Sequence, residues 1–182
     1  MDFGSLSLIR LSNQHTFKLF DCGDEDLNDF LLNNSKHFLN TLLAVTYILE
    51  SEDDTVAFFS LFNDKITQED FSSNRKWYQF RKTSISSEKN FRSYPAIKIG
   101  RLGICNDYKG NRVGTAILDY IKGWFVDNNR TGCKFITVDA YSDSLLFYEK
   151  NEFKYLTDED KGKDTRLMYF DLSPYMDDNL VS

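Results

Sequence analysis

The sequence predicts a mixed α/β fold, organised as a single domain over residues 1–182, with a central, partly parallel sheet flanked by helices. Apolar residues follow strand spacing and helical spacing in turn. They give β, α, β, β in the front half and strand, helix, strand, helix, strand in the back half. The back half needs a crossover connection, which makes part of the sheet parallel. A chain of 182 residues suits one well-covered core, because two separate domains would each be small.

The front half begins with a short strand, predicted by the apolar residues Leu6, Leu8, Ile9 and Leu11. Asp24–Asp26 then place negative charge where it stabilises a helix N-terminus. That helix is predicted by apolar residues at helical spacing: Leu27, Phe30, Leu31 and Phe38. Two strands, Leu42–Glu50 and Thr55–Ile66, lie on either side of the polar turn Ser51–Asp54 and predict an antiparallel hairpin.

The segment 67–93 reads as an irregular polar insertion. Its six basic and three acidic residues give it a net charge of +3, within a chain whose formal net charge is −6. The back half is predicted to contain three strands and two helices: strands Ala96–Cys105, Phe135–Tyr141 and Thr165–Leu172, and helices Gly114–Val126 and Ser144–Asn151.

Composition narrows the function. The acidic balance, with a pI near 5.0, disfavours nucleic-acid binding unless a local basic face exists. Three cysteines without a C-x-x-C pair, and the isolated histidines His15 and His37, predict neither a disulfide framework nor a metal site. The cytoplasm is therefore the expected compartment. The apolar runs are too short to span a bilayer, so no membrane role is expected.

The residues before Gly114–Val126 have the form of a phosphate-binding loop. Four amides at a helix N-terminus lack intrahelical partners, and the helix dipole adds partial positive charge. Gly110 and Gly114 ease the path of the loop, and Thr115 offers a hydroxyl in the first turn. Lys109 and Arg112 add positive charge. Alone the pattern is weak, because a glycine turn entering a helix is more often only a turn.

Together with a later helix, this loop resembles the GCN5-related N-acetyltransferase superfamily. The loop reads Lys109-Gly110-Asn111-Arg112-Val113-Gly114 where the family has Gln/Arg-x-x-Gly-x-Gly/Ala. Phe147-Tyr148-Glu149-Lys150 matches the family's Phe-Tyr-Glu-Lys helix. Phe20–Gly23, Leu27–Leu31 and the hairpin are similar to the family's front half. The resemblance thus covers nearly the whole chain, with its core over about 96–156.

The resemblance implies the acyl-CoA N-acyltransferase fold, with acetyl-CoA as the donor. The implied donor-binding residues are Leu102, Gly103, Ile104, Lys109, Gly110, Asn111, Arg112, Val113, Gly114, Thr115 and Ser142. By the family pattern, backbone groups around Leu102–Ile104 pair with the pantetheine arm, where this strand separates from the strand containing Val138. The amides of Arg112–Thr115 hold the pyrophosphate.

Three positions depart from the family pattern. Arg112 replaces the first Gly of the loop, and Ser142 stands where Asn is common. Glu152 stands where a Gly usually ends the helix. A left-handed conformation at residue 152 would cost about 1 kcal/mol, unless Asn151 adopts that conformation instead.

Tyr148 matches the family position of the general acid. A phenol near the sulfur can perform this role, because it can protonate the leaving thiolate. The alternative is a packing role as one of ten tyrosines. The general base is not identified, since 96–105 contains no Asp or Glu, and a water chain or a substrate that arrives already deprotonated is the expected substitute. Asp107 and Asp139 are the carboxylates to test, although a solvated or capping role is commoner for such residues.

The main functional hypothesis is direct acetyl transfer from acetyl-CoA to a primary amine of a small molecule or protein. One alternative is a toxin-like acetyltransferase acting on aminoacyl-tRNA, because Phe20–Gly23 and Gly100–Leu102 are similar to such toxins. The basic and aromatic residues of Arg75–Lys82 would then contact phosphates and stack on bases. The acidic net charge of the whole chain argues against this alternative. The other alternative is a non-catalytic module that binds coenzyme A. A homodimer is left open.

Overall fold

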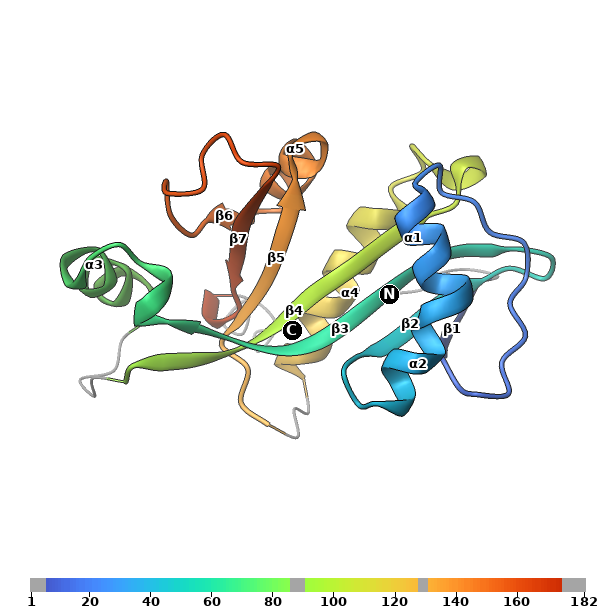
Figure 1. Cartoon of the computed structure of the whole chain (residues 1–182), viewed down its shortest axis with the longest axis horizontal. Helices are drawn as coiled ribbons and strands as arrows, with labels where there is room; N and C mark the ends of the chain where they lie inside the picture. Colours follow the sequence, from blue (N-terminus) through green and yellow to red (C-terminus); the bar gives the residue numbers. More distant parts are fainter. Residues whose placement is uncertain (1–5, 86–90, 128–130, 175–182) are drawn as a thin grey trace. The chain divides into compact units, whose positions relative to one another are not determined.

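The structure is a computed structural model that describes residues 6–85, 91–127 and 131–174. Its seven strands are β1 (Ser7–Arg10), β2 (Val45–Glu50), β3 (Thr55–Thr67), β4 (Ser93–Ile104), β5 (Phe135–Tyr141), β6 (Lys154–Tyr155) and β7 (Thr165–Asp171). The α-helices are α1 (Glu25–Asp29), α2 (Ser35–Asn40), α3 (Asn74–Ser84), α4 (Val113–Val126) and α5 (Leu145–Lys150), with a π-helical turn, Phe30–Asn34, between α1 and α2 (Figure 1).

The strands form one mixed sheet in the order β1-β2-β3-β4-β5-β7-β6. β2 pairs antiparallel with β3, as the hairpin pattern predicted, and β1 pairs antiparallel with β2. β5 pairs parallel with β4 and antiparallel with β7. The predicted mixed α/β class with a partly parallel sheet is therefore confirmed. β6, a two-residue strand beside β7, was not predicted.

Residue contacts divide the chain into two compact units. The first consists of Met1–Phe62 with Ile99–Ile121, and the second consists of Asn63–Lys98 with Lys122–Ser182. Each unit is therefore built from two separate stretches of sequence. The single-domain organisation over 1–182 stays a prediction. No helix in the described parts of the chain is long and apolar enough to cross a membrane.

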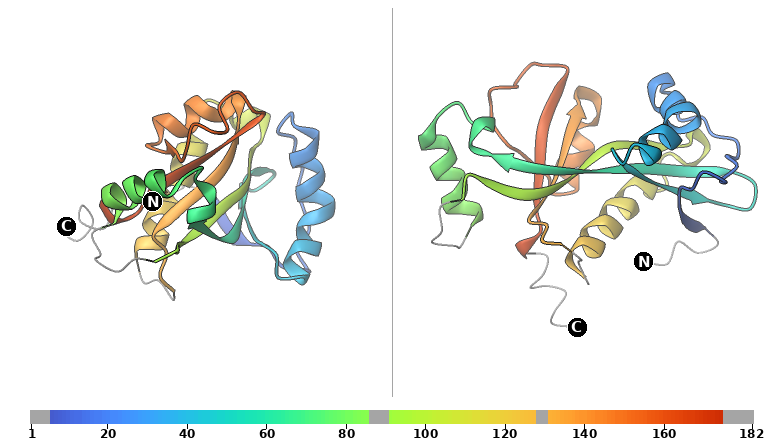
Figure 2. Two further views of the ribbon diagram at one scale, coloured as in Figure 1. Left: turned by 60° about the vertical axis from the view of Figure 1, so that its left-hand side comes forward. Right: turned by 60° about the horizontal axis from the view of Figure 1, so that its bottom comes forward.

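In the first unit, the α1–α2 run packs over the β2–β3 hairpin (Figure 2). Asp24 caps α1 by accepting a hydrogen bond from the amide of Leu27 at 3.1 Å, as expected for an acidic helix N-terminus. Phe30 and Leu31 are buried with Ile48 and Phe58. The apolar spacing that predicted the helix thus forms the core of this unit.

The second unit contains a helix where the sequence predicted an irregular insertion. Ser73 caps α3 by accepting from the amide of Lys76, and the helix buries Trp77 and Phe80 against Ile66 and Phe135. Those two side chains are three residues apart, which places them on one helical face. The prediction failed because α3 shows only this narrow apolar face, and Phe135, which helps to cover it, is distant in the sequence.

Candidate active site

The end of β4 carries three of the predicted donor-binding residues, Leu102, Gly103 and Ile104, and all three belong to the first unit. A Cβ atom at Gly103 would lie 2.6 Å from the ring of Phe58. Only glycine fits this close approach without displacing the aromatic core. Beyond the strand, the amide of Cys105 donates to the carbonyl of Val56 at 2.9 Å. The strand end is therefore fixed on the hairpin beneath it.

The loop before α4 is held by contacts with the segment 21–23. The amide of Asn106 donates to the carbonyl of Asp21 at 2.9 Å, and the ammonium of Lys109 donates to the carbonyl of Cys22 at 2.6 Å. These bonds join the Phe20–Gly23 segment to the loop. The predicted contact of Lys109 with donor phosphates stays a prediction, since its ammonium holds the loop in this structure.

Asp21 is an anchor that the sequence analysis did not identify. Its carboxylate accepts from the Gly23 amide at 2.7 Å and from the Asn28 side chain at 2.8 Å. These hydrogen bonds, with the positive charge of Lys109 nearby, lower the pKa of Asp21. The carboxylate is therefore ionised throughout the neutral range. The signal in the sequence was the Asp-x-Gly turn preceding a helix.

Two residues of the loop adopt left-handed backbone conformations, Gly110 at φ +82° and Arg112 at φ +59°. The value at Arg112 explains why a glycine is usual at this position, since a side chain there costs about 1–2 kcal/mol. Arg112 is exposed, and within the described residues no carboxylate pairs with its guanidinium. Gly110, Asn111 and Arg112 thus form an exposed turn that enters α4.

The first turn of α4 presents unpaired amides. The first helical hydrogen bond runs from the amide of Ala116 to the carbonyl of Arg112 at 3.0 Å. The amides of Val113, Gly114 and Thr115 meet no backbone acceptor in the described part of the chain. With the N-terminal charge of a 14-residue helix and the cation of Arg112, they form a cradle suited to an anion.

Tyr148 lies on α5, in the second unit, and is 6% exposed. Its ring packs edge-on against Phe147 and Phe153, with centroids 5.1 Å and 5.3 Å away. Burial raises the pKa of Tyr148 well above the ordinary value for a phenol. The described residues of this unit give the hydroxyl no hydrogen-bond partner. The phenol is thus a protonated donor at neutral pH, which is compatible with the predicted acid role.

The turn after α5 decides between the two alternatives that the sequence left open. Glu152, not Asn151, adopts the left-handed conformation, with φ +68° against −100° at Asn151. The side-chain amide of Asn151 is engaged in donating to the carbonyl of Phe147 at 2.7 Å, which keeps Asn151 within the helical turn. The amide of Phe153 then closes the turn on the carbonyl of Tyr148 at 3.0 Å.

Ser142 begins the 3-10 turn Ser142–Ser144 that leads into α5. Its hydroxyl donates to the carbonyl of Asp164 at 3.2 Å, and its amide donates to the same oxygen. Ser142 therefore fastens this turn to the loop before β7. Its predicted contact with the donor stays a prediction.

The two carboxylates proposed as bases have different surroundings. Asp107 lies exposed in the 3-10 turn Asn106–Tyr108 of the first unit. Asp139 lies on β5 of the second unit, 2.7 Å from the ammonium of Lys98. A third carboxylate, Asp64 on β3, accepts a hydrogen bond from Thr137 of β5 and was missed by the sequence analysis. The described residues contain no group of three side chains placed to hold a metal ion.

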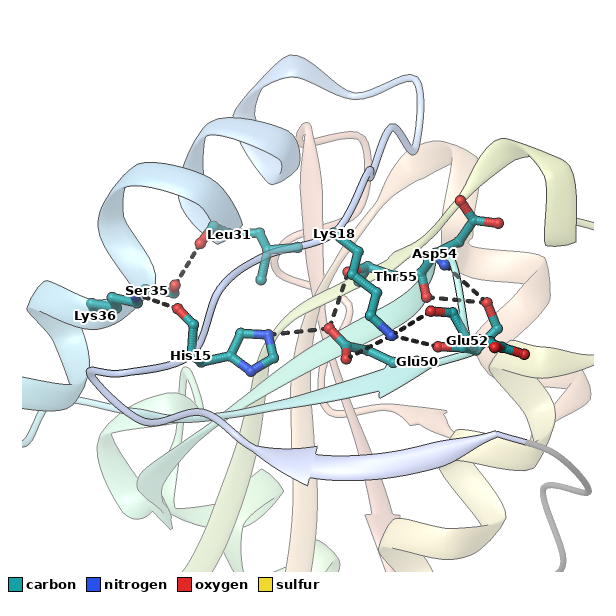
Figure 3. Close-up of polar contacts among 10 residues, drawn as sticks. His15, Lys18, Leu31, Ser35, Lys36, Glu50, Glu52, Asp54 and Thr55 are labelled. Atoms are coloured by element: carbon teal, nitrogen blue, oxygen red, sulfur yellow. Dashed lines mark hydrogen bonds and ion pairs between the residues drawn. The ribbon is translucent and has the colours of Figure 1, made fainter.

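In the first unit, His15 and Lys18 of the 12–20 segment form a polar cluster with the buried carboxylate of Glu50 (Figure 3). Nε2 of His15 lies 3.1 Å from Oε1 of Glu50, off the hydrogen-bonding direction, and Nζ of Lys18 lies 3.5 Å from Oε2. Lys18 also donates to the carbonyl of Ser51 at 2.6 Å. In the sequence His15 is isolated from other titratable side chains of its kind. The cluster instead fastens this segment to the β2–β3 turn.

The chain matches no protein-family model and no curated protein. AtaT complexed with acetyl-methionyl-tRNAfMet resembles it with a TM-score of 0.75, over 97% of this chain and 99% of that chain, at 18% identity. AtaTR bound with AcCoA resembles it with a TM-score of 0.75, over 98% of this chain and 99% of that chain, at 19% identity. A mutant of KacT resembles it with a TM-score of 0.72, over 97% of this chain and 99% of that chain, at 18% identity.

This likeness covers almost the whole of both chains. It confirms the fold expected from the loop and helix motifs, the fold of the GCN5-related N-acetyltransferases. The predicted donor-binding residues 102–115 all lie in the first unit, whereas Ser142 and Tyr148 lie in the second.

Proposed function

We propose that the protein transfers the acetyl group of acetyl-CoA to the α-amino group of an aminoacyl-tRNA. The observation that carries this proposal is the nearly full-length fold likeness to AtaT, whose structure was solved with acetyl-methionyl-tRNAfMet. AtaTR, which is similar over nearly its full length as well, was solved bound with AcCoA. These neighbours favour the tRNA hypothesis over a small-molecule or protein amine, which was the main hypothesis from the sequence.

The donor half of the proposal is supported by the first turn of α4. The unpaired amides of Val113–Thr115 and the exposed cation of Arg112 suit the pyrophosphate of acetyl-CoA. The donor-strand residues Leu102–Ile104 would pair with the pantetheine arm through their backbone groups, as the resemblance implies.

The chemical half is supported by Tyr148. When the amine attacks the thioester carbonyl carbon, a C–N bond forms and the C–S bond then breaks. A phenol whose pKa is raised by burial stays protonated until the thiolate leaves, and it can then give the sulfur its proton. Tyr148 would recover a proton from the nitrogen of the new amide, so that no charge accumulates.

The tRNA half is supported by α3, in a different way from the one first expected. Trp77 and Phe80 are buried in the core and are not free to stack on bases. Arg75 and Lys82 are exposed, and Tyr78 is 61% exposed, so the outer face of α3 remains basic with one aromatic ring. A local basic face of this kind would allow contacts with phosphates although the net charge of the chain is −6.

The function is tested by incubating the protein with labelled acetyl-CoA and a set of aminoacyl-tRNAs, and by following label into the aminoacyl ester. We expect transfer to aminoacyl-tRNA but not to uncharged tRNA. Tyr148→Phe should lower kcat by about 10²–10³-fold and leave the donor affinity unchanged. Transfer only to free amines, insensitive to salt, would return the acceptor to the small-molecule class.

Donor binding is measured separately by calorimetric titration with acetyl-CoA and with coenzyme A. Gly114→Trp would fill the first turn of α4, where Gly114 is buried, and should abolish binding of both ligands. Binding by the parent without turnover on any amine would identify a non-catalytic module that binds coenzyme A.

A further inference from the structure

A carboxylate and a hydroxyl meet at the last register pair of the parallel strands in the second unit. The β4–β5 pairing runs from Ala96↔Phe135 to Lys98↔Thr137. Thr137 is 1% exposed, and its hydroxyl donates to the carboxylate of Asp64 on β3. The next nearest acceptor, the carbonyl of Ile97, is 3.4 Å away, so the single hydroxyl proton belongs to Asp64.

The surroundings of Asp64 separate it from the other carboxylates of this face. Lys98, the register partner of Thr137, is turned toward Asp139 and neutralises that residue at 2.7 Å. Asp64 has no cationic partner within the described residues. It is half-buried, because Ile66, two residues further along β3, is already part of the core. The carboxylate of Asp64 is thus held in one position, beside the buried apolar cluster that contains Ile66.

We propose that Asp64 is the proton acceptor for the incoming amine and that Thr137 is its positioning residue. This inference rests on the proposed function. An acceptor that arrives as an ammonium group must lose one proton before its nitrogen can attack the thioester. Asp64 takes that proton and becomes a neutral carboxyl group. The free amine then forms the C–N bond, the C–S bond breaks, and the thiolate takes its proton from Tyr148, which recovers one from the nitrogen of the new amide.

The other carboxylates considered for this step, among the residues that the structure describes, are less suited to it. The 96–105 segment holds no Asp or Glu, Asp139 is paired with Lys98, and Asp107 lies on an exposed turn of the first unit. The hydroxyl of Thr137 fixes one oxygen of Asp64, which leaves the other oxygen free to receive a proton. The Lys98–Asp139 pair beside it carries no net charge and so leaves Asp64 as the negative group that attracts an ammonium.

The experiment compares the wild type with Asp64→Asn, Thr137→Val and Thr137→Ser over a pH series, in acetylation of aminoacyl-tRNA. We expect Asp64→Asn to lower kcat/KM by up to about tenfold near pH 7, where about one α-amino group in ten is already neutral, and by more at lower pH. The deficit should shrink as the pH passes about 8, where an α-amino group loses its own proton. Thr137→Val should lose about threefold near pH 7, whereas Thr137→Ser, which keeps the hydroxyl, should retain the activity of the wild type.

Glu69→Gln is the matched control, since it converts an exposed carboxylate of the same unit into an amide. It should have the pH profile of the wild type. Acetyl-CoA affinity and thermal unfolding are measured for every variant, and all should match the wild type. A loss in Asp64→Asn that is equal at every pH, or no loss at all, would overturn the role of Asp64 while leaving the proposed function intact. A wild type that acetylates no aminoacyl-tRNA at any pH would reject the function itself, and the role of Asp64 with it.

Discussion

The ammonium nitrogen of Lys122 lies 3.0 Å from the backbone carbonyl oxygen of Asn151, at the end of the helix that carries Tyr148. The lysine side chain is 3% exposed and lies 4.3 Å above the ring of Phe170. The last carbonyls of a helix have no intrahelical partners, and positive charge is favourable there. A buried cation from α4 therefore caps α5 and holds the turn that follows Tyr148.

Replacing Lys122 by Met should lower the free energy of unfolding by about 1–3 kcal/mol, because the buried carbonyl of Asn151 loses its donor. It should also lower kcat more than donor affinity, since the turn that holds Tyr148 loosens. Denaturant unfolding and calorimetric titration measure the two effects. Lys150→Met is the control, because this exposed lysine in the last turn of α5 should change stability by less than about 0.5 kcal/mol.

Glu152→Gly should stabilise the protein by about 0.5–1 kcal/mol, since glycine adopts φ +68° without steric cost. The contact of Glu152 with Lys122, at 3.8 Å from a carboxylate that is 75% exposed, offsets little of this gain. Asn151→Gly should have the opposite sign, because Asn151 is not left-handed and its side chain bonds to Phe147. Thermal melts of both variants would decide between the two positions. Equal shifts would contradict the assignment of strain to residue 152.

Arg112→Gly should raise stability and weaken donor binding together. The gain of about 0.5–1 kcal/mol comes from relieving φ +59°, and loss of the guanidinium should weaken acetyl-CoA binding by about tenfold. Leu42→Gly is a matched control, because Leu42 has the same φ and is 91% exposed. It should give the gain in stability with unchanged donor affinity. If both variants lost donor affinity equally, Arg112 would have no specific role.

Glu50→Gln should destabilise the protein by about 2–3 kcal/mol at neutral pH. The side chain is 6% exposed, and the substitution removes the negative charge that faces His15 and Lys18. Glu52→Gln is the control, since Glu52 is exposed and contacts Lys18 only through its backbone carbonyl. Urea unfolding at low and high salt should give the same loss, because a buried pair is little screened.

Burial raises the pKa of Tyr148, and this fixes the sign of a pH effect on stability. In the unfolded chain the phenol ionises from about pH 10, whereas the folded protein keeps its proton. The unfolded state then binds fewer protons, so stability falls as the pH rises above about 10. Tyr148→Phe should lose less stability over this range, as measured by urea unfolding. Tyr47 and Tyr169, whose pKa values are also raised by burial, keep part of the effect in both proteins.

The parts of the fold that the sequence predicted well are those whose signal is local. Phe135–Tyr141 is a strand with the predicted bounds, because a β-branched run is diagnostic without help from distant residues. The departures at Arg112 and Glu152 were visible in the motifs, and both residues have positive φ values. A missing glycine within a motif thus marked two of the three described non-glycine residues that have positive φ, whereas the third, Leu42, carried no such signal.

What the sequence missed depends on distant partners. α3 has only Trp77 and Phe80 on its buried face, and its helical state requires Ile66 and Phe135 to cover them. His15 looked isolated because its partner Glu50 lies on β2, far along the sequence. Asp64 and Thr137 are likewise joined only when β3 and β5 take their places in the sheet.

The interleaved composition of the first unit sets an order of events during translation. Met1–Phe62 cannot complete that unit until Ile99–Ile121 has left the ribosome, because the unit includes both stretches. At about 5–20 residues per second, synthesis of the intervening residues takes on the order of seconds. During that interval the aromatic side chains of the early hairpin and helix stand without the strand end and helix that later complete their unit. Folding of the first unit therefore waits until part of the second unit has been synthesised.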